Sequence, residues 1–353
     1  MSAGLIERLW YQQGKPLAVL SPLAWLYRTV AESKRRKAWQ ARNEPLPVPV
    51  VVVGNITAGG TGKSPLTARL VQRMQQEGWR PVILSRGYGG KSDRYPLLVS
   101  HTTPATVSGD EPLMLALATS CPVVVDPDRC RGAHWALEQQ LGDVLICDDG
   151  LQHYRLPRDI ELAVFDDRRG VGNGALIPVG PLREPVSRLA TVDFVVLNGA
   201  EFPPSGQQID EFAGIEHPDI HAMALRPSSL VNLNSGETLT PGALQGQSVR
   251  AVAGIGNPSR FFDTLRSLGA RVQEAPYADH HRFRPQDLGS RPGEWLVMTA
   301  KDAVKCRDFA PDNAWVLTVD ACLSEPFEHR FLERLRRCSK LLHQQNTERT
   351  HHG

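Results

Sequence analysis

Four consecutive valines run directly into a glycine-rich loop, and this junction constrains the fold more than any other feature of the sequence. Val50–Val53 is β-branched throughout, which is typical of a buried strand. The loop Gly54-Asn55-Ile56-Thr57-Ala58-Gly59-Gly60-Thr61-Gly62-Lys63-Ser64 follows it. Pro65 then suits the first turn of a helix, where a missing N–H costs nothing. A strand, a glycine-rich loop and a helix in this order are the context of a phosphate-binding P-loop.

The P-loop prediction gives its residues distinct roles. The glycines let backbone N–H groups turn inward around phosphates, Lys63 reaches the β/γ oxygens, and the Ser64 hydroxyl can hold Mg²⁺. The residues predicted to contact the nucleotide are Thr57, Ala58, Gly59, Gly60, Thr61, Gly62, Lys63 and Ser64. The match is imperfect, because Thr57 stands where the motif G-x-x-x-x-G-K-S has its first glycine.

A second apolar run ends in two carboxylates. The strand-like segment 143–147 leads into Asp148 and Asp149. An aspartate at the end of a strand downstream of a P-loop is the Walker B arrangement, which places carboxylate near the metal. Together the two motifs predict Mg²⁺ and ATP. A guanine nucleotide is the alternative, but the guanine-binding pattern Asn-Lys-x-Asp does not follow a strand here.

The order of strand-like and helical segments predicts an α/β fold. Strand-like runs alternate with helical patterns from residue 50 to about 197, which favours a P-loop NTPase-like, doubly wound, mostly parallel sheet. A strand-rich connector follows, and a smaller α/β domain begins near Val249. At 353 residues the chain is long enough for two domains. The predicted parts are 1–47, an amphipathic helical segment, 48–200, the P-loop domain, 201–245, the connector, and 246–345, the smaller domain.

The first 47 residues carry eight basic and three acidic side chains, although the whole chain has a net charge of only +2. An almost continuous apolar stretch over 17–27, interrupted by Pro22, precedes the basic run 34–37. This pattern fits an interfacial anchor on an anionic leaflet and a core-packing helix equally well. The stretch is too short to span a bilayer. A signal peptide and nucleic-acid binding are both disfavoured.

Several further motifs resemble those of the tetraacyldisaccharide 4'-kinase family, the lipid A 4'-kinases. They are Ser85-Arg86-Gly87-Tyr88-Gly89-Gly90, Gly109-Asp110-Glu111-Pro112, Asp148-Asp149-Gly150-Leu151-Gln152-His153, Gly172-Asn173-Gly174, Pro181-Leu182-Arg183-Glu184, Asp279-His280 and Thr299-Ala300-Lys301-Asp302-Ala303-Val304-Lys305. The likeness covers nearly the whole chain, and the family's P-loop shares the displaced glycines. It implies transfer of the ATP γ-phosphate to the 4'-hydroxyl of a tetraacylated disaccharide 1-phosphate, in lipid A biosynthesis.

The resemblance also implies roles for single residues. Asp110 would accept the hydroxyl proton, paired with His280, while Lys63 would assist at the phosphates. His281, the next residue, is the alternative to His280 as the partner of Asp110. The implied metal ligands are Ser64, Asp148, Asp149 and Glu184, and the implied substrate contacts are Arg86, Tyr88, Glu111, His153, Asn173 and Arg183. Because Asp110 and His280 fall in different predicted domains, their meeting would require the domains to close.

The resemblance places the protein peripherally or monotopically on the cytoplasmic face of the inner membrane, with no obligate protein partner and no nucleic acid. A membrane-surface P-loop ATPase that drives a partner protein is the alternative function. Asp110 discriminates between them, because a sugar kinase needs a base for its acceptor hydroxyl.

Overall fold

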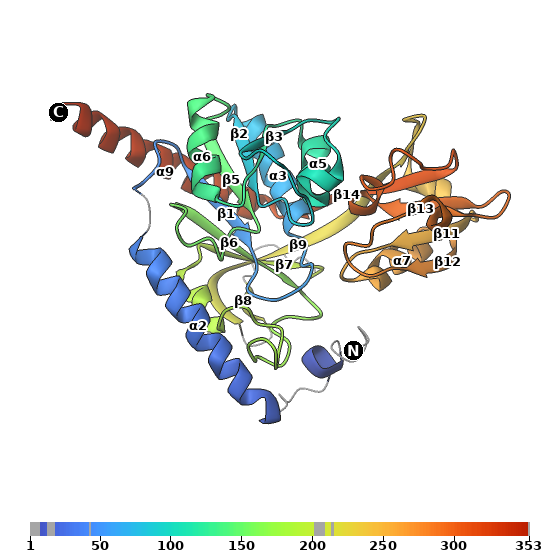
Figure 1. Cartoon of the computed structure of the whole chain (residues 1–353), viewed down its shortest axis with the longest axis horizontal. Coiled ribbons are helices and arrows are strands. Elements are labelled where there is room, and N and C mark those ends of the chain that lie inside the picture. The colour runs from blue at the N-terminus through green and yellow to red at the C-terminus, as the bar shows by residue number, and fades with distance from the viewer. Residues whose placement is uncertain (1–7, 13–17, 42–43, 201–208, 213–214, 352–353) are drawn as a thin grey trace. The chain divides into compact units, whose positions relative to one another are not determined.

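The computed structural model describes residues 8–12, 18–41, 44–200, 209–212 and 215–351 (Figure 1). The chain forms two compact units, and neither is continuous in sequence. Unit 1 comprises Met1–Ser85, Asp128–Ala224 and Cys322–Gly353, and unit 2 comprises Arg86–Pro127 and Leu225–Ala321. These units differ from the predicted linear parts, because residues 86–127 pack with the later segment and the last helix packs with the first.

Unit 1 is built on a parallel sheet. Its strands, in spatial order, are β2 (Pro81–Ser85), β5 (Val144–Asp148), β1 (Val50–Gly54), β6 (Ile160–Asp166), β7 (Phe194–Asn198) and the first part of β9 (Ile215–Asn232). Every residue of β1 and of β5 is buried, as expected for strands covered on both faces. The predicted P-loop NTPase-like, mostly parallel architecture is confirmed.

Unit 1 includes the helices α3 (Lys63–Gln76), α6 (Arg129–Glu138) and α9 (Glu325–His351), the helix that ends at the C-terminus in Figure 1. Helix α3 buries an apolar stripe that includes Leu66, Leu70 and Met74. Helix α9 buries Phe327 and Phe331. The 3₁₀-helix η3 (Val186–Thr191) leads into β7.

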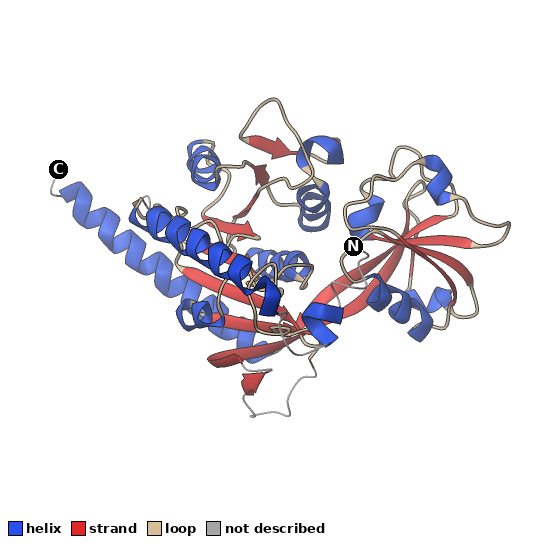
Figure 2. Cartoon of the chain, turned by 60° about the horizontal axis from the view of Figure 1, so that its bottom comes forward, coloured by secondary structure: helices blue, strands red, loops and turns tan. Residues whose placement is uncertain are grey.

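Unit 2 contains four further parallel strands, in the order β12 (Arg271–Pro276), β11 (Ser248–Ala253), β13 (Trp295–Thr299) and the first part of β14 (Ala314–Leu323). Side chains alternate between two cores: Ala251 joins one with Phe262 of α7 (Pro258–Ser267), while Val252 joins the other with Phe283. Helices accordingly lie on both sides of these strands (Figure 2).

The earlier segment of unit 2 supplies the strand pair β3 (Leu97–Val99) and β4 (Val123–Val125) and the helices α4 (Ala105–Ser108) and α5 (Asp110–Thr119). Helix α5 contacts the short helix α8 (Ala300–Ala303). The remaining elements are β8 (Ile209–Phe212), β10 (Thr238–Leu239), and the 3₁₀-helices η4 (Pro241–Leu244) and η5 (Pro285–Leu288). Strands β8 and β10 both pair with β9, so the described part of the predicted connector 201–245 is rich in strands.

The N-terminal segment forms η1 (Arg8–Gln12), η2 (Ala18–Leu20) and the 20-residue helix α2 (Ser21–Gln40). Pro22 was expected to interrupt the apolar stretch, but it lies in the first turn of α2, where its ring fits without breaking a hydrogen bond. Among the described helices, none is both long enough and apolar enough to cross a bilayer.

Candidate active site

The P-loop of unit 1 is braced from several sides. Gly59 and Gly62 have φ angles of +102° and +94°, a region that favours glycine. The side chain of Asn55 donates to the carbonyl of Gly59 at 3.2 Å, and that of Asn198 donates to the carbonyl of Thr61 at 3.1 Å. These contacts hold the loop in a fixed shape at the N-terminus of α3, where a helix favours anions.

Two side chains of this loop fit a polyphosphate. The Thr61 hydroxyl is buried and has no hydrogen-bond partner among the described residues. The Lys63 ammonium lies 3.3 Å from Oδ1 of Asn55 and 3.6 Å from Oδ1 of Asp149. A buried hydroxyl without a partner is costly, so the loop is suited to a ligand that offers acceptor oxygens.

The paired aspartates at the end of β5 have different surroundings. Asp148 is buried and accepts hydrogen bonds from the hydroxyls of Ser64 at 3.1 Å and Thr67 at 2.9 Å. Asp149 is partly exposed and lies 3.4 Å from the Arg183 guanidinium. Burial opposes its charge, but the cations of Lys63 and Arg183 outweigh burial and lower the pKa of Asp149.

This donor set fits Mg²⁺, which is bound in proteins through one or two carboxylates, with waters and phosphate oxygens completing its shell. Asp148 and Ser64 are in contact, and Asp149 lies beside the P-loop lysine. Within the described ranges no group of three or more His, Cys, Asp or Glu side chains is arranged to hold a metal on its own.

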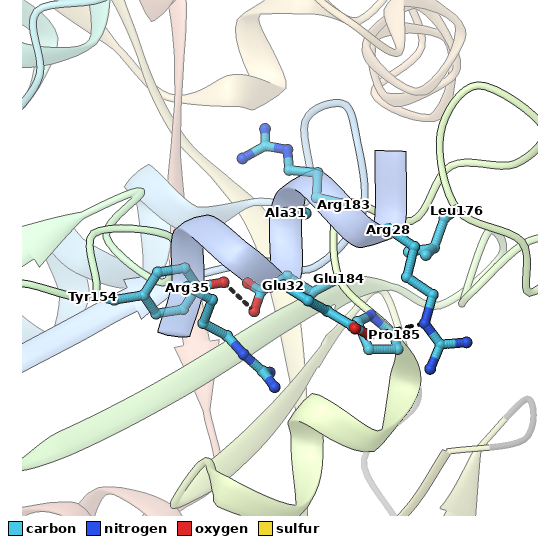
Figure 3. Close-up of a pocket in the computed structure, with 9 residues that line it drawn as sticks. All are labelled: Arg28, Ala31, Glu32, Arg35, Tyr154, Leu176, Arg183, Glu184 and Pro185. Carbon is cyan, nitrogen blue, oxygen red and sulfur yellow. Dashed lines mark hydrogen bonds and ion pairs between the residues drawn. The ribbon is translucent and has the colours of Figure 1, made fainter. Parts of the chain in front are cut away.

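Glu184, a predicted metal ligand, is buried and has its carboxylate engaged by protein groups. It accepts hydrogen bonds from Gln152 at 2.6 Å and from the Tyr154 hydroxyl, and it lies 3.4 Å from Arg188. Figure 3 shows Glu184 and Tyr154 in a small pocket between α2 and the segment 176–185. Burial and the Glu184 charge both raise the pKa of Tyr154 well above its usual range, so this phenol stays a hydrogen-bond donor.

In unit 2 the structure brings Asp110 and His280 together. Nδ1 of His280 lies 3.1 Å from Oδ2 of Asp110, which is buried at the first turn of α5. Asp110 and His280 belong to one unit and are in contact in this structure. The expectation that two domains must close to bring them together is therefore wrong. His281 instead lies 3.2 Å from Asp287, so His280, and not His281, is the histidine in contact with Asp110.

The segment 86–90 covers this pair. The Tyr88 ring lies against the His280 ring, with centroids 4.7 Å apart. Gly90 packs so closely on the turn before α5 that an added Cβ would stand 2.3 Å from the backbone nitrogen of Gly109. Gly89 lies next to Asp110 and His280, because an added Cβ would be 3.9 Å from Oδ1 of Asp110.

The other predicted substrate residues fall in different places. Glu111 accepts a hydrogen bond from Lys301 at 3.1 Å, next to the Asp110 and His280 pair. Arg86 is exposed at the start of unit 2, and His153 lies in unit 1, in the turn after Asp149. The Asn173 side chain binds backbone groups, including the carbonyl of Val179 at 3.0 Å, and so holds its own loop together. The predicted substrate residues are therefore divided between the two units.

Sequence reasoning missed four residues that contact the predicted ones. Thr67 lies three positions after Ser64 on α3, so helical spacing could have identified it as a second partner of Asp148. Asn55 directly follows β1 and could have been found as a neighbour of Lys63. Gln152 donates to Glu184 and accepts from Arg183, and Lys301 lies between two carboxylates; no sequence pattern indicates either contact.

Comparisons with known proteins identify the family to which the chain is similar. The family model described as tetraacyldisaccharide-1-P 4'-kinase matches residues 16–336. The chain is 46% identical over 329 residues to a tetraacyldisaccharide 4'-kinase of Ectopseudomonas mendocina, covering 92% of this chain and 95% of the relative. It is 44% identical over 341 residues to the enzyme of that name from Vibrio cholerae, with 94% and 97% coverage.

Among solved structures, LpxK from Aquifex aeolicus in complex with ATP superposes with a TM-score of 0.74 at 29% identity, covering 91% of this chain and 98% of that one. The matches extend over both units, and the resemblance seen in the sequence is confirmed. The chain belongs to the tetraacyldisaccharide-1-P 4'-kinase family.

Proposed function

We propose that this protein transfers the γ-phosphate of ATP to the 4'-hydroxyl of a tetraacylated disaccharide 1-phosphate, the reaction for which its relatives are named. The observation that carries the proposal is the 3.1 Å contact between Asp110 and His280 in a chain that also holds a P-loop. A sugar kinase needs a base for its acceptor, whereas an ATPase that drives a partner needs only to orient water.

The nucleotide would be held by unit 1. In this proposal the backbone of residues 57–64 and the Lys63 ammonium bind the phosphates, and the Thr61 hydroxyl donates to a phosphate oxygen. Ser64, Asp148 and Asp149 would hold Mg²⁺, with Glu184 available only if its present contacts change. When bound, Mg²⁺ neutralises phosphate charge.

The acceptor chemistry would be carried by unit 2. Asp110 takes the proton of the 4'-hydroxyl, whose oxygen forms a bond to the γ phosphorus. The bond from that phosphorus to the β–γ bridging oxygen breaks, and ADP leaves. His280 donates through Nδ1 to Asp110 and keeps the carboxylate oriented toward the hydroxyl. Arg86, Tyr88, Glu111, His153, Asn173 and Arg183 remain proposed substrate contacts, and Arg183 is suited to a phosphate because its guanidinium offers paired donors.

We further propose that α2 docks the enzyme peripherally on the cytoplasmic face of the inner membrane. Leu23, Leu26 and Val30 of α2 recur at spacings of three and four residues, so they form one stripe, and each is between 46% and 54% exposed. A different side of α2 faces the rest of unit 1, because Ala31 and Arg35 line a small pocket with Tyr154 and Glu184 (Figure 3). An exposed apolar stripe followed by basic residues suits an anionic leaflet.

The kinase proposal is tested by transfer of radiolabelled γ-phosphate from ATP to the lipid acceptor in detergent micelles. Asp110→Asn should lower kcat by about 10²-fold or more while ATP binding persists, because the base is lost and the shape is kept. The control is Asp308→Asn, at an exposed position of unit 2, which should leave kcat unchanged. Full transfer by Asp110→Asn would refute the assigned role.

Membrane docking is tested by flotation with vesicles that contain anionic lipid. Leu26→Gln should weaken binding, whereas Leu117→Gln, which changes an exposed leucine of unit 2, should leave it intact. Equal binding by both variants would contradict docking through α2.

A further inference from the structure

Lys301 lies beside Nε2 of His280, the ring nitrogen that does not contact Asp110. Its ammonium lies 3.1 Å from Oε1 of Glu111, 3.2 Å from Oδ1 of Asp279 and 3.5 Å from Nε2 of His280. The side chain is 16% exposed. Lys301 is therefore held between two carboxylates with a donor directed at the imidazole.

The backbone under Lys301 is firmly anchored. Thr299 caps α8 by accepting from the amide of Asp302, and its hydroxyl donates to Oδ2 of that aspartate at 2.8 Å. Asp302 is fully buried and also accepts from the amide of Gly254 at 2.9 Å. Lys305, one turn later, pairs with Asp302 at 2.7 Å. The segment Thr299–Lys305 is thus a rigid support for two lysines.

The groups around His280 are mostly acidic. Within unit 2 its ring faces Asp110 from α5, Asp279 from its own loop at 3.8 Å, the Tyr88 ring and Lys301. Nearby, Glu111 binds Lys301, and Lys305 lies 3.9 Å from Asp110 but is paired with Asp302. Two carboxylates thus face the imidazole, and the Lys301 ammonium is the cation that lies 3.5 Å from its Nε2.

We propose that Lys301 is a positioning residue that holds the His280 ring neutral, with Nε2 accepting from the ammonium and the Nδ1 proton directed at Asp110. This inference rests on the proposed function. A cationic imidazole would neutralise the Asp110 carboxylate and make it a poorer base for the acceptor hydroxyl. Burial opposes the charge of Lys301, but the carboxylates of Glu111 and Asp279 outweigh burial and raise the pKa of Lys301, so the ammonium persists at neutral pH.

The direct test is the ¹⁵N spectrum of the full-length protein labelled at histidine, with the His280 signals assigned by His280→Gln. At pH 7.5 the wild type should show an unprotonated Nε2 and a protonated Nδ1. In Lys301→Met the Nε2 signal should move toward that of imidazolium, and Lys301→Arg should restore it in large part. An unchanged His280 spectrum in folded Lys301→Met would overturn the proposal.

Kinetics supply the second readout. Lys301→Met should lower kcat about tenfold or more and leave KM for ATP within about twofold, since the nucleotide groups lie in unit 1. Lys340→Met, which removes an exposed lysine of α9, is the matched control and should change neither. An equal loss in Lys301→Arg and Lys301→Met would overturn the charge argument. If the wild type phosphorylates no lipid, the proposed function fails, while the ¹⁵N spectrum still decides the contact of Lys301 with His280.

Discussion

Gly62, the residue before α3, provides a stringent test of the P-loop conformation. Its φ of +94° is strained for any residue with a Cβ, and an alanine Cβ would stand 2.4 Å from Nδ2 of Asn198. That nitrogen donates to the carbonyl of Thr61, so Gly62→Ala must displace the side chain that braces the loop. Gly60, two residues earlier, has no atom within 4 Å of an added Cβ and no left-handed φ.

The size of the effect follows from these contacts. A left-handed backbone costs an alanine about 1–2 kcal/mol. The loss of the Asn198 hydrogen bond costs about 1 kcal/mol more. The smaller conformational freedom of the unfolded alanine chain offsets about 0.5–1 kcal/mol. Gly62→Ala should therefore lower the free energy of unfolding by about 1–2.5 kcal/mol, whereas Gly60→Ala, for which only the unfolded-chain contribution applies, should raise it by about 0.5–1 kcal/mol.

The assay is urea unfolding followed by far-ultraviolet circular dichroism, without nucleotide, so that ligand binding does not enter the comparison. The two variants differ from the wild type by the same chemical group in the same loop. If Gly62→Ala and Gly60→Ala unfold at the same urea concentration, the loop geometry described above is incorrect.

Three further predictions concern stability. The contribution of Asp149 to stability should be complete above pH 3.8 and fade below it, because its pKa is lower in the folded chain; the unfolding free energies of wild type and Asp149→Asn should converge as the pH falls. Burial lowers the pKa of His221 from 6.5 to about 4 in the folded chain. As the pH falls from 6.5 to 4, the unfolded chain therefore binds the proton first, so the wild type should lose stability over this range and His221→Gln should not. Glu328→Gln should destabilise by about 1–2 kcal/mol in urea unfolding, because the Glu328 carboxylate accepts a hydrogen bond from Arg69 at 2.7 Å and forms an ion pair with Arg73 at 2.9 Å; a wild-type midpoint would refute this role.

The local patterns of the chain predicted most of its strands and helices. The valine run 50–53 lies in β1, the segment 143–147 corresponds to β5 within one residue at each end, and Pro65 lies in the first turn of α3, as predicted. These elements carry strong local signals: β-branched runs, and a glycine or acidic residue at a helix start.

Contacts between distant segments could not be read in the same way. Residues 86–127 join unit 2 because Gly90 packs on the turn before α5 and α5 contacts α8, and neither contact leaves a mark in local sequence. The pairing of Asp110 with His280 spans 170 positions, and the family resemblance alone pointed to it. The position of Lys301 between two carboxylates has no periodic signal at all. Local sequence patterns thus predict helices and strands, whereas contacts between side chains of distant segments are seen only in the folded structure.

The most direct test of the kinase account is the ratio of labelled lipid to ADP. With ATP labelled at the γ-phosphate and the tetraacyldisaccharide 1-phosphate acceptor in micelles, the account predicts one labelled lipid for each ADP formed and almost no ADP without acceptor. Steady release of ADP with no labelled lipid, from folded protein that binds ATP, would contradict the account and favour an ATPase that drives a partner.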